Sequence, residues 1–460
     1  GAWQQAPRLF SEMSDGIDRI DQIDLFDSID LLDYTSHPMN ILDTFKARHL
    51  FEDMTSTELA KALDTPLTVY AGFDPTNDSL QAGNFVTIMA LAHLQRAGHR
   101  VIALVGGATG LIGDPSGKSK ERNLLSAEQV ERNLVGIKEN LSRFIDFNPQ
   151  SPNPAILVNN YDWFKSFTFI DLLREIGRYF RMGVMLSKDS VKKRMESDDG
   201  MSFTEFCYQI LQGYDFYHLY KTYGCTLQLG GSDQWGNITA GTELVRRISG
   251  QEVFGMTFPL VCDSTGKKFG KSEGNAIFLD ARKTPYYDFY QFFLRTMDAD
   301  VIRYLKIFTF LPMARIAELE QAVAAAPERR EAQQVLAEEL TRTVHGEQGL
   351  AVAKKATQVL FGGSLDGLAA ADLEAIFANV PSAALPAAEV LGKPAFEVIA
   401  AAGMAASKGE ARRLVQQGGL SINNVKAGGL DRCFAPTDLI EGRLAVLRSG
   451  KKSFFLLRAE

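Results

Sequence analysis

Short apolar runs that alternate with helical stretches, between about residues 40 and 258, constrain the fold of this chain most strongly. Three of these runs are residues 67–70 (LTVY), 101–105 (VIALV) and 155–158 (AILV). Short runs of this kind, separated by helical patterns, are typical of parallel strands joined by crossover helices. The sequence therefore predicts an α/β, Rossmann-like domain built on a parallel sheet.

A glycine-rich segment, residues 105–118 (VGGATGLIGDPSGK), directly follows the second of these runs. A strand that leads into a glycine-rich turn is where open α/β sheets bind their ligands. The segment is neither a P-loop nor a dinucleotide-binding fingerprint, because the required glycine spacing is absent. It indicates a ligand site of another kind at the end of this strand.

Two lysines three residues apart, Lys268 and Lys271, lie in the segment 268–272 (KFGKS), which EGN follows. Lysine is a compact, mobile cation that can follow phosphate oxygens as their charge shifts, and Gly270 lets the backbone turn. The segment therefore indicates a loop that binds polyphosphate. On spacing alone, a solvated basic loop is the simpler interpretation, because this spacing is common on protein surfaces.

Together with residues 70–76 (YAGFDPT) and 228–238 (QLGGSDQWGNI), these segments closely resemble bacterial-type tyrosyl-tRNA synthetases, which are class I aminoacyl-tRNA synthetases. The resemblance extends from about Met39 to Glu460 and keeps the motifs in the order of that family. It implies an ATP-dependent tyrosine–tRNA ligase, with Mg²⁺ carried by the ATP and no structural metal. The chain departs from the family in one signature, because residues 81–84 read QAGN where HxGH or HxGN is usual.

The composition and the resemblance together predict several domains. With 460 residues, 45% of them hydrophobic, the chain can bury more than one core, and about three domains are expected. The predicted parts are a disordered acidic extension (1–38), a Rossmann-like catalytic domain (39–283), a helical domain on the anticodon side of the tRNA (284–363), a linker rich in Ala, Pro and Ser (364–390), and a small α+β, S4-like RNA-binding domain (391–460).

The extension repeats Asp at every third position from Asp15 to Asp33. A period of three fits neither a strand nor an α-helix. We interpret this segment as a disordered tail, or as sequence upstream of a start at Met39. It is a poor organelle presequence, because presequences are rich in Arg and lack acidic residues.

Residues 406–423, near the C-terminus, resemble the S4 RNA-binding motif. Ser407 precedes Glu410 by three residues, which is the spacing of a helix N-cap. The predicted RNA contacts on this helix are Lys408, Arg412 and Arg413, and the alternative is an amphipathic helix with ordinary surface arginines. The net charge of −7 argues against a chain that coats nucleic acid over its whole surface, but it permits one local basic face.

The resemblance implies a tyrosine pocket with the polar residues Tyr70, Asp114, Tyr208, Gln212, Asp215, Gln228 and Gln234. Tyr70 and Asp215 match the residues that meet the phenolic hydroxyl, and such a pocket rejects phenylalanine because its own polar groups would be left unpaired. Asp114, Tyr208 and Gln212 match the acceptors for the substrate ammonium. Spacings of four and three place Tyr208, Gln212 and Asp215 on one face of a helix. The alternative is that Tyr208 and Asp215 are ordinary half-buried helix residues.

The resemblance also assigns residues to ATP and to catalysis. The ATP-binding residues that it implies are Asp74, Thr76, Gly83, Asp233, Lys268 and Lys271. The catalytic residues that it implies are Gln81, Asn84, Thr87, Lys118, Arg122, Lys268, Lys271 and Ser272. Gln81 stands in the position of the usual histidine, and its amide can still donate a hydrogen bond to the γ-phosphate, without a charge.

Two other functions stay open on the sequence alone. One is a catalytically degenerate synthetase paralogue that acts as an RNA-binding or regulatory protein. The other is a ligase for a different amino acid. The retention of both phenol-binding positions, Tyr70 and Asp215, argues against the second, and the retention of Lys268 and Lys271 argues against the first.

The remaining features predict the cellular setting and the assembly. The four cysteines include no CxxC pair, so neither a zinc site nor a disulfide framework is indicated, and a cytoplasmic protein is expected. No apolar run reaches the roughly 18 residues of a membrane span. Relatives are homodimers, and the apolar stretch 163–170 (WFKSFTFI) is the predicted contact surface.

Overall fold

The computed structural model describes residues 40–116, 126–196, 200–272, 275–360, 363, 365, 369–377, 380–450 and 453–460. The chain divides into two compact units. The first contains Gly1–Leu279 and Met297–Ala332, and the second contains Asp280–Thr296 and Gln333–Glu460. The predicted helical domain, residues 284–363, is therefore divided between the two units.

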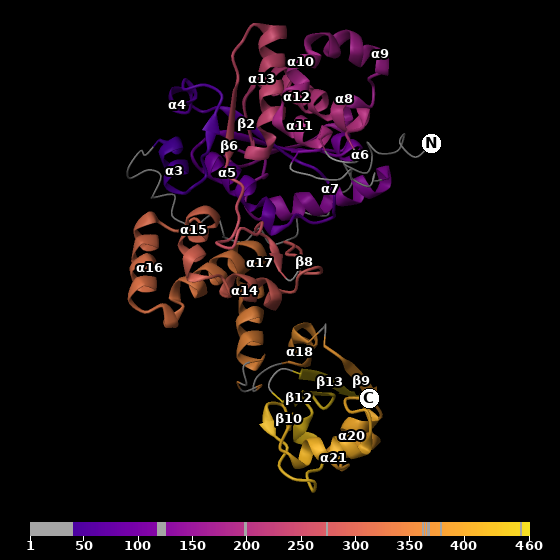
Figure 1. Cartoon of the computed structure of the whole chain (residues 1–460). Coiled ribbons are helices and arrows are strands. Elements are labelled where there is room, and N and C mark those ends of the chain that lie inside the picture. Colours follow the sequence, from indigo (N-terminus) through magenta and orange to yellow (C-terminus); the bar gives the residue numbers. More distant parts are fainter. Residues whose placement is uncertain are drawn as a thin grey trace. The chain divides into compact units, whose positions relative to one another are not determined.

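A six-stranded sheet forms the centre of the first unit, and Figure 1 labels its strands β2 and β6. The strand order is β1-β6-β5-β2-β3-β4. Its strands are β1 (Asp53–Met54), β2 (Thr68–Phe73), β3 (Arg100–Val105), β4 (Ile156–Asn159), β5 (Cys225–Gly231) and β6 (Phe254–Phe258). All neighbours are parallel except β1 and β6, which are antiparallel. The prediction of a parallel-sheet α/β domain is confirmed.

The order of the strands reverses between β2 and β5. From β2 the chain continues outward through β3 and β4, whereas β5 and β6 lie on the other side of β2. The carboxyl ends of two such strands lead into connections on opposite sides, which opens a crevice for ligands. Tyr70 on β2 lies beside Gln228 on β5 in the register of this pair.

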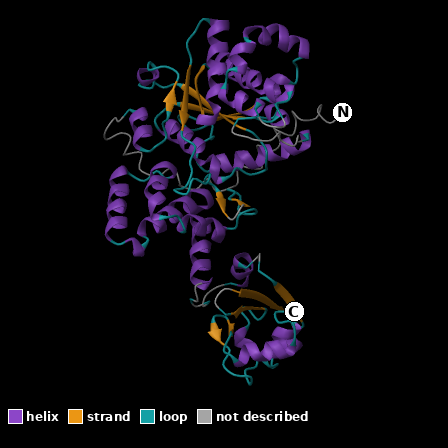
Figure 2. Ribbon diagram, in the orientation of Figure 1, coloured by secondary structure: helices purple, strands orange, loops and turns teal. Residues whose placement is uncertain are grey.

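Helices pack around this sheet (Figure 2). Four long helices of the first unit are α5 (Phe85–Arg96), α7 (Ala127–Leu141), α12 (Phe203–Tyr223) and α13 (Trp235–Ser249). The shorter ones are α3 (Ile41–Ala47), α4 (Leu59–Ala62), α6 (Thr109–Ile112), α8 (Tyr161–Phe164), α9 (Phe169–Asp171), α10 (Met182–Leu186) and α11 (Asp189–Met195). Helix α12 begins at a capping box formed by Ser202 and Glu205 and ends at Gly224, whose φ of 65° closes the helix.

Two further helices of the first unit come from later in the chain, α15 (Asp298–Phe308) and α16 (Met313–Ala325). The buried Arg48 helps to hold these two helices in the first unit. Its guanidinium donates to the carbonyl oxygens of Thr309 (2.8 Å) and Leu311 (2.6 Å), which lie between α15 and α16. The same guanidinium donates to the carbonyl oxygen of Lys306 at 3.2 Å, which lies in the last turn of α15, where a helix leaves its carbonyl groups unpaired.

The second unit contains helices and a small sheet. Its helices are α14 (Tyr286–Leu294), most of α17 (Glu331–Leu360), α18 (Ala370–Ile376), α19 (Ala387–Val390), α20 (Ala395–Ala401) and α21 (Lys408–Gln416). Its sheet has the order β11-β10-β12-β13-β9. The strands are β9 (Ser382–Leu385), β10 (Leu420–Ile422), β11 (Val425–Lys426), β12 (Leu444–Ser449) and β13 (Ser453–Ala459).

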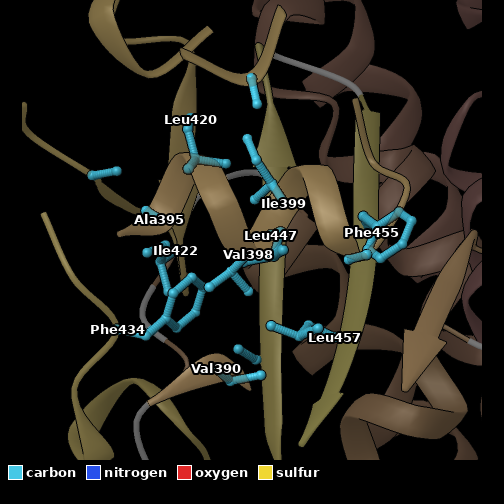
Figure 3. Packing of buried hydrophobic residues seen from close by; sticks show 14 of the residues in the cluster. Val390, Ala395, Val398, Ile399, Leu420, Ile422, Phe434, Leu447, Phe455 and Leu457 are labelled. Carbon is cyan, nitrogen blue, oxygen red and sulfur yellow. The ribbon is translucent and has the colours of Figure 1, made fainter. Parts of the chain in front are cut away.

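The core of this C-terminal α+β domain lies between α20 and the sheet. Figure 3 shows Val398 and Ile399 of α20 against strand residues such as Leu447 and Leu457. Strand β9 pairs in parallel with β13 and so extends this sheet. Part of the segment predicted as a linker, residues 364–390, is therefore built into the domain. Ser407 accepts the backbone N–H of Glu410 at 3.2 Å, which confirms the predicted N-cap of α21.

Candidate active site

A cavity of about 280 Å³ lies in the first unit, where β2 and β5 end. Fourteen of the predicted site residues line it: Tyr70, Asp74, Thr76, Gly83, Asn84, Thr87, Asp114, Tyr208, Gln212, Asp215, Gln228, Asp233, Gln234 and Lys268. They come from strands, turns and the helices α5 and α12, which are far apart in the sequence. One cavity therefore collects the residues predicted for tyrosine and most of those predicted for ATP.

One end of the cavity contains two buried polar groups, Tyr70 and Asp215, with exposed fractions of 1% and 2%. Among the described residues, the hydroxyl of Tyr70 has no hydrogen-bond partner. Burial and the nearby Asp215 raise the pKa of Tyr70 well above its usual value, so the phenol stays protonated. A buried, unpaired hydroxyl costs free energy unless a ligand satisfies it.

Asp215 accepts hydrogen bonds from two residues that the sequence analysis did not assign to this site. The Nε1 of Trp163 donates to its Oδ1 at 2.9 Å, and the Nδ2 of Asn160 donates to its Oδ2 at 3.0 Å. Burial raises the pKa of Asp215 to about 7, and these two bonds oppose the rise. A signal was available in the sequence, because both residues follow directly after the strand at 156–159, at the same edge of the sheet as the glycine-rich turn.

Asn160 also connects Asp215 to the middle of the cavity. Its Nδ2 donates to Thr109 Oγ1 at 3.0 Å, and Thr109 donates in turn to Asp74 Oδ1 at 3.1 Å. The hydroxyl of Tyr208 donates to the same carboxylate, with its oxygen 3.1 Å from Oδ2. Burial and the charges of Asp74 and Asp114 raise the pKa of Tyr208, so it stays a neutral donor.

The cavity also contains a second set of linked polar side chains. Gln234 Nε2 donates to Asp114 Oδ2 at 2.6 Å. Asn237, a further residue that sequence reasoning missed, lies one helical turn after Gln234 in α13. Its Nδ2 donates to Gln212 Oε1 at 3.0 Å and to Gln234 Oε1 at 3.2 Å. These amide groups therefore orient one another. The Oε1 of Gln228 is buried and has no hydrogen-bond partner in the described part of the chain.

The two segments that resemble ATP signatures contact each other through their backbones. Gly270 has a φ of +91°, and a Cβ there would lie 2.7 Å from the nitrogen of Gly83. Ile277 N–H donates to the Gly270 carbonyl at 2.9 Å, and Ala82 N–H donates to the Ile277 carbonyl at 2.8 Å. This close approach requires glycine at position 270.

Phe269 anchors the lysine-containing loop. Its ring is 7% exposed and stacks on Phe308, with centroids 4.6 Å apart and planes inclined by 21°. Tyr304 packs against it edge-on at 4.9 Å. Both partners belong to α15, which explains why this helix joins the first unit. Lys268, next to Phe269, lines the cavity.

Several predicted catalytic residues are not on the cavity wall or are not described. Gln81 is not among the lining residues; it forms a β-bridge with Phe278, and its N–H donates to Asn84 Oδ1 at 3.0 Å. The backbone of Lys271–Ser272 forms β7, which pairs with β8 (Asn275–Ala276). The side chains of these two residues, and all of Lys118 and Arg122, lie outside the described residues.

The predicted RNA-binding residues share the exposed side of α21. Lys408, Arg412 and Arg413 are all exposed. Lys408 Nζ lies 3.7 Å from the carboxylate of Glu397, and the guanidinium of Arg412 lies 5.7 Å from the ring centroid of Phe396. Such contacts of Lys408 and Arg412 contribute little at an exposed surface.

No group of His, Cys, Asp or Glu in the described part of the chain has the arrangement needed to hold a metal ion. None of the helices seen there is long and apolar enough to cross a membrane.

Comparison with known proteins defines the class of this fold and site. Residues 61–362 match the family model described as tRNA synthetases class I (W and Y), and the chain therefore belongs to that family. Residues 372–457 match the model of the tyrosine–tRNA ligase SYY-like C-terminal domain. The predicted resemblance to bacterial-type tyrosyl-tRNA synthetases is confirmed.

Individual relatives agree with the family models. The chain is 49% identical to the tyrosine–tRNA ligase of Protochlamydia amoebophila over 420 residues, which cover 91% of this chain and 99% of that one. Identity to the tyrosine–tRNA ligase of Streptococcus suis is also 49%, over 91% of this chain and all of the relative. A C-terminally truncated mitochondrial tyrosyl-tRNA synthetase of Aspergillus nidulans is similar in structure, with a TM-score of 0.64, 32% identity, and coverage of 72% of this chain and 97% of that chain.

Proposed function

We propose that this chain is a tyrosine–tRNA ligase, which activates L-tyrosine with ATP and transfers the tyrosyl group to the 3′ end of tRNA(Tyr). The observation that carries the proposal is the buried pair at one end of the cavity. Tyr70 offers an unpaired hydroxyl and Asp215 offers a carboxylate held by two donors. A phenolic hydroxyl can donate to Asp215 and also pair with Tyr70.

This pair supports selection of tyrosine over phenylalanine. A phenylalanine ring in the same position would leave the Tyr70 hydroxyl buried and unpaired, and Asp215 would receive no hydrogen bond beyond those from Trp163 and Asn160. Discrimination against a ligand that lacks a hydroxyl is strong when the site is built to bond that hydroxyl. Tryptophan also lacks a hydroxyl at this place and is bulkier.

The middle of the cavity suits the amino acid backbone of the substrate. Asp114, Tyr208 and Gln212 would accept or orient the ammonium, which needs acceptors within hydrogen-bond reach. Gln228 and Gln234 would orient the carboxylate, since amide nitrogens donate to it. Asp233 would accept hydroxyl groups of the ATP ribose.

The remaining wall suits the triphosphate of ATP, which brings Mg²⁺ with it. Asp74 and Thr76 would lie near the α-phosphate, and Gly83, Asn84, Thr87, Lys268 and Lys271 near the β- and γ-phosphates. Charge accumulates on the departing pyrophosphate, so cations and donors oriented in advance stabilise the transition state most effectively.

The reaction has two steps and forms no covalent bond to the enzyme. A carboxylate oxygen of tyrosine attacks the α-phosphorus of ATP, and the bond from that phosphorus to pyrophosphate breaks. A terminal ribose hydroxyl of the tRNA then attacks the carbonyl carbon of the adenylate, loses its proton, and AMP leaves. The exposed cations of α21 would contact the RNA through its phosphates.

We also propose a homodimer in a reducing, cytosolic compartment. The first unit exposes several large apolar side chains, which are Phe169 (60%), Ile170 (62%), Met182 (59%), Val184 (52%) and Phe203 (66%). Exposed apolar residues in such number are typical of a protein contact surface. Trp163 does not belong to this surface, because it is buried against Asp215. All four cysteines are free, as a reducing compartment requires.

Amino-acid-dependent exchange of pyrophosphate into ATP tests the first step. The purified chain should catalyse exchange with tyrosine and show far less with phenylalanine or tryptophan at equal concentration. Exchange with none of the three would favour a degenerate paralogue. Preferential exchange with another amino acid would favour a different ligase.

Charging of tRNA by the full chain tests the RNA-binding role of α21. Substituting Arg412→Gln together with Arg413→Gln should reduce tRNA charging and its salt dependence, while tyrosine-dependent exchange stays at the parent rate. Equal loss of both activities would contradict a role confined to RNA.

A further inference from the structure

His218 stacks on the residue that orients the phenol acceptor. Its imidazole lies against the indole of Trp163, with ring centroids 4.3 Å apart and planes inclined by only 17°. The same indole donates its N–H to Asp215 at 2.9 Å. His218 follows Asp215 by three residues in α12, so both side chains lie on one face of this helix. Three side chains thus lie in series, from the half-exposed His218 to the buried Asp215.

The indole of Trp163 also packs in a mostly apolar cluster. Trp163 belongs to a buried cluster with Tyr70, Ile102 and Leu104. Apolar side chains exclude water, but they form no hydrogen bond that would fix the direction of the indole N–H. A flat ring stacked on the indole restricts its tilt, and restricting the tilt keeps the N–H aimed at the carboxylate.

The imidazole is itself held in place and is neutral at neutral pH. Burial and the charge of Lys221 lower the pKa of His218. The hydroxyl of Thr222 lies 3.4 Å from its Nε2, and Tyr214 lies beside the ring at a centroid distance of 6.1 Å. These contacts do not reach the cavity, and His218 is not one of its lining residues.

We propose that His218 is a positioning residue for tyrosine recognition, which acts through Trp163 on Asp215. The inference rests on the proposed function, and it adds a specificity determinant that does not touch the substrate. It requires that removing the stack weakens the interaction with the phenol of tyrosine. The interaction with ATP, at the other end of the cavity, should not change.

The Michaelis constants of three variants test this proposal. His218→Ala should raise KM for tyrosine by about threefold to tenfold, which is the range expected for an aromatic stack, with kcat and KM for ATP unchanged. His218→Phe, which keeps a flat ring, should restore most of the tyrosine affinity. Thr204→Ala is the matched control on the same helix, because Thr204 is exposed and lies about four helical turns before His218, and its KM should equal that of the parent.

A double-mutant cycle isolates the path through the indole. In a Trp163→Phe background, His218→Ala should add little further rise in KM for tyrosine, because the N–H that it positions is already gone. Additive effects would overturn the proposal, as would a parent-like KM in His218→Ala. A His218→Phe variant as impaired as His218→Ala, with KM for ATP also raised, would show a general structural role instead. If the parent protein does not activate tyrosine, both the proposed function and this inference are wrong. If the parent is active and one of the contrary results above is found, only the inference is wrong.

Discussion

The two ends of the cavity are built in different ways. At the proposed phenol end, hydrogen bonds between side chains fix the geometry, because Asp215 accepts hydrogen bonds from Trp163 and Asn160. At the proposed phosphate end, two backbone segments are in close contact, because Gly270 lies so near Gly83 that a Cβ at position 270 would not fit. Under the proposed function, selectivity for an amino acid would depend on particular functional groups, whereas phosphate binding would depend on the course of the main chain.

This difference predicts which substitutions affect which substrate. Changes to polar side chains at the phenol end should act on KM for tyrosine, because they alter contacts that the bound substrate makes. Changes in backbone conformation at the phosphate end should act on kcat, because misplaced cations and donors lose transition-state contacts.

Gly270→Ala should have the largest effect. The new methyl group would meet Gly83 N at 2.7 Å, and the φ of +91° is unfavourable for alanine. We expect adenylate formation to slow on the order of 100-fold, as for a misplacement of about 1 Å at a reacting centre. Stopped-flow measurement of adenylate formation checks this.

Gly266→Ala provides the matched control for that substitution. Its φ of +84° is similarly unfavourable, but no atom lies within 4 Å of the added Cβ. It should therefore slow the reaction much less. Equal losses in both variants would mean that conformational strain, and not the contact between the two signatures, matters.

Asn160→Ala should have the next largest effect, confined to tyrosine. It removes one of the two bonds to Asp215 and the link to Thr109. Loss of a hydrogen bond to a charged group costs about 1.5–3 kcal/mol, so KM for tyrosine should rise by at least about tenfold. Steady-state exchange kinetics with each substrate varied in turn measure this. A comparable rise in KM for ATP would break the distinction between the two ends.

The effect of pH on KM for tyrosine should be smaller than the effect of Asn160→Ala. Because burial raises the pKa of Asp215 to about 7, this carboxyl becomes protonated as the pH falls through 7 and loses the charge that attracts the phenol. KM for tyrosine should rise by a few fold between pH 8 and pH 6. Asp215→Asn should abolish this part of the pH profile, and a profile unchanged by that substitution would show that another group titrates.

Gln81→Ala should have the smallest effect. The sequence-based hypothesis makes Gln81 a donor to the γ-phosphate, in which case kcat should fall while KM stays the same. The described cavity does not include Gln81 among its lining residues, and we therefore expect an adenylate formation rate within about twofold of the parent, in the absence of a transition-state hydrogen bond. A fall of tenfold or more would restore the sequence-based hypothesis.

Local patterns in the sequence predicted part of this architecture. The offsets among Tyr208, Gln212 and Asp215 are a property of one helix, and all three line the cavity. Trp163, Asn160 and Asn237 were missed because their roles depend on which elements pack together. Strand β9 was predicted as linker because its four residues, SAAL, carry no strong alternation, and its pairing with β13 comes from tertiary contacts.

The specificity ratio of a double variant tests the central claim most directly. Tyr70→Phe combined with Asp215→Ser removes both partners of the phenol. We expect the ratio of kcat/KM for tyrosine to kcat/KM for phenylalanine, measured by pyrophosphate exchange, to fall toward one. KM for ATP should stay near the parent value. A double variant that still strongly prefers tyrosine would contradict the assignment of this buried pair to the phenol.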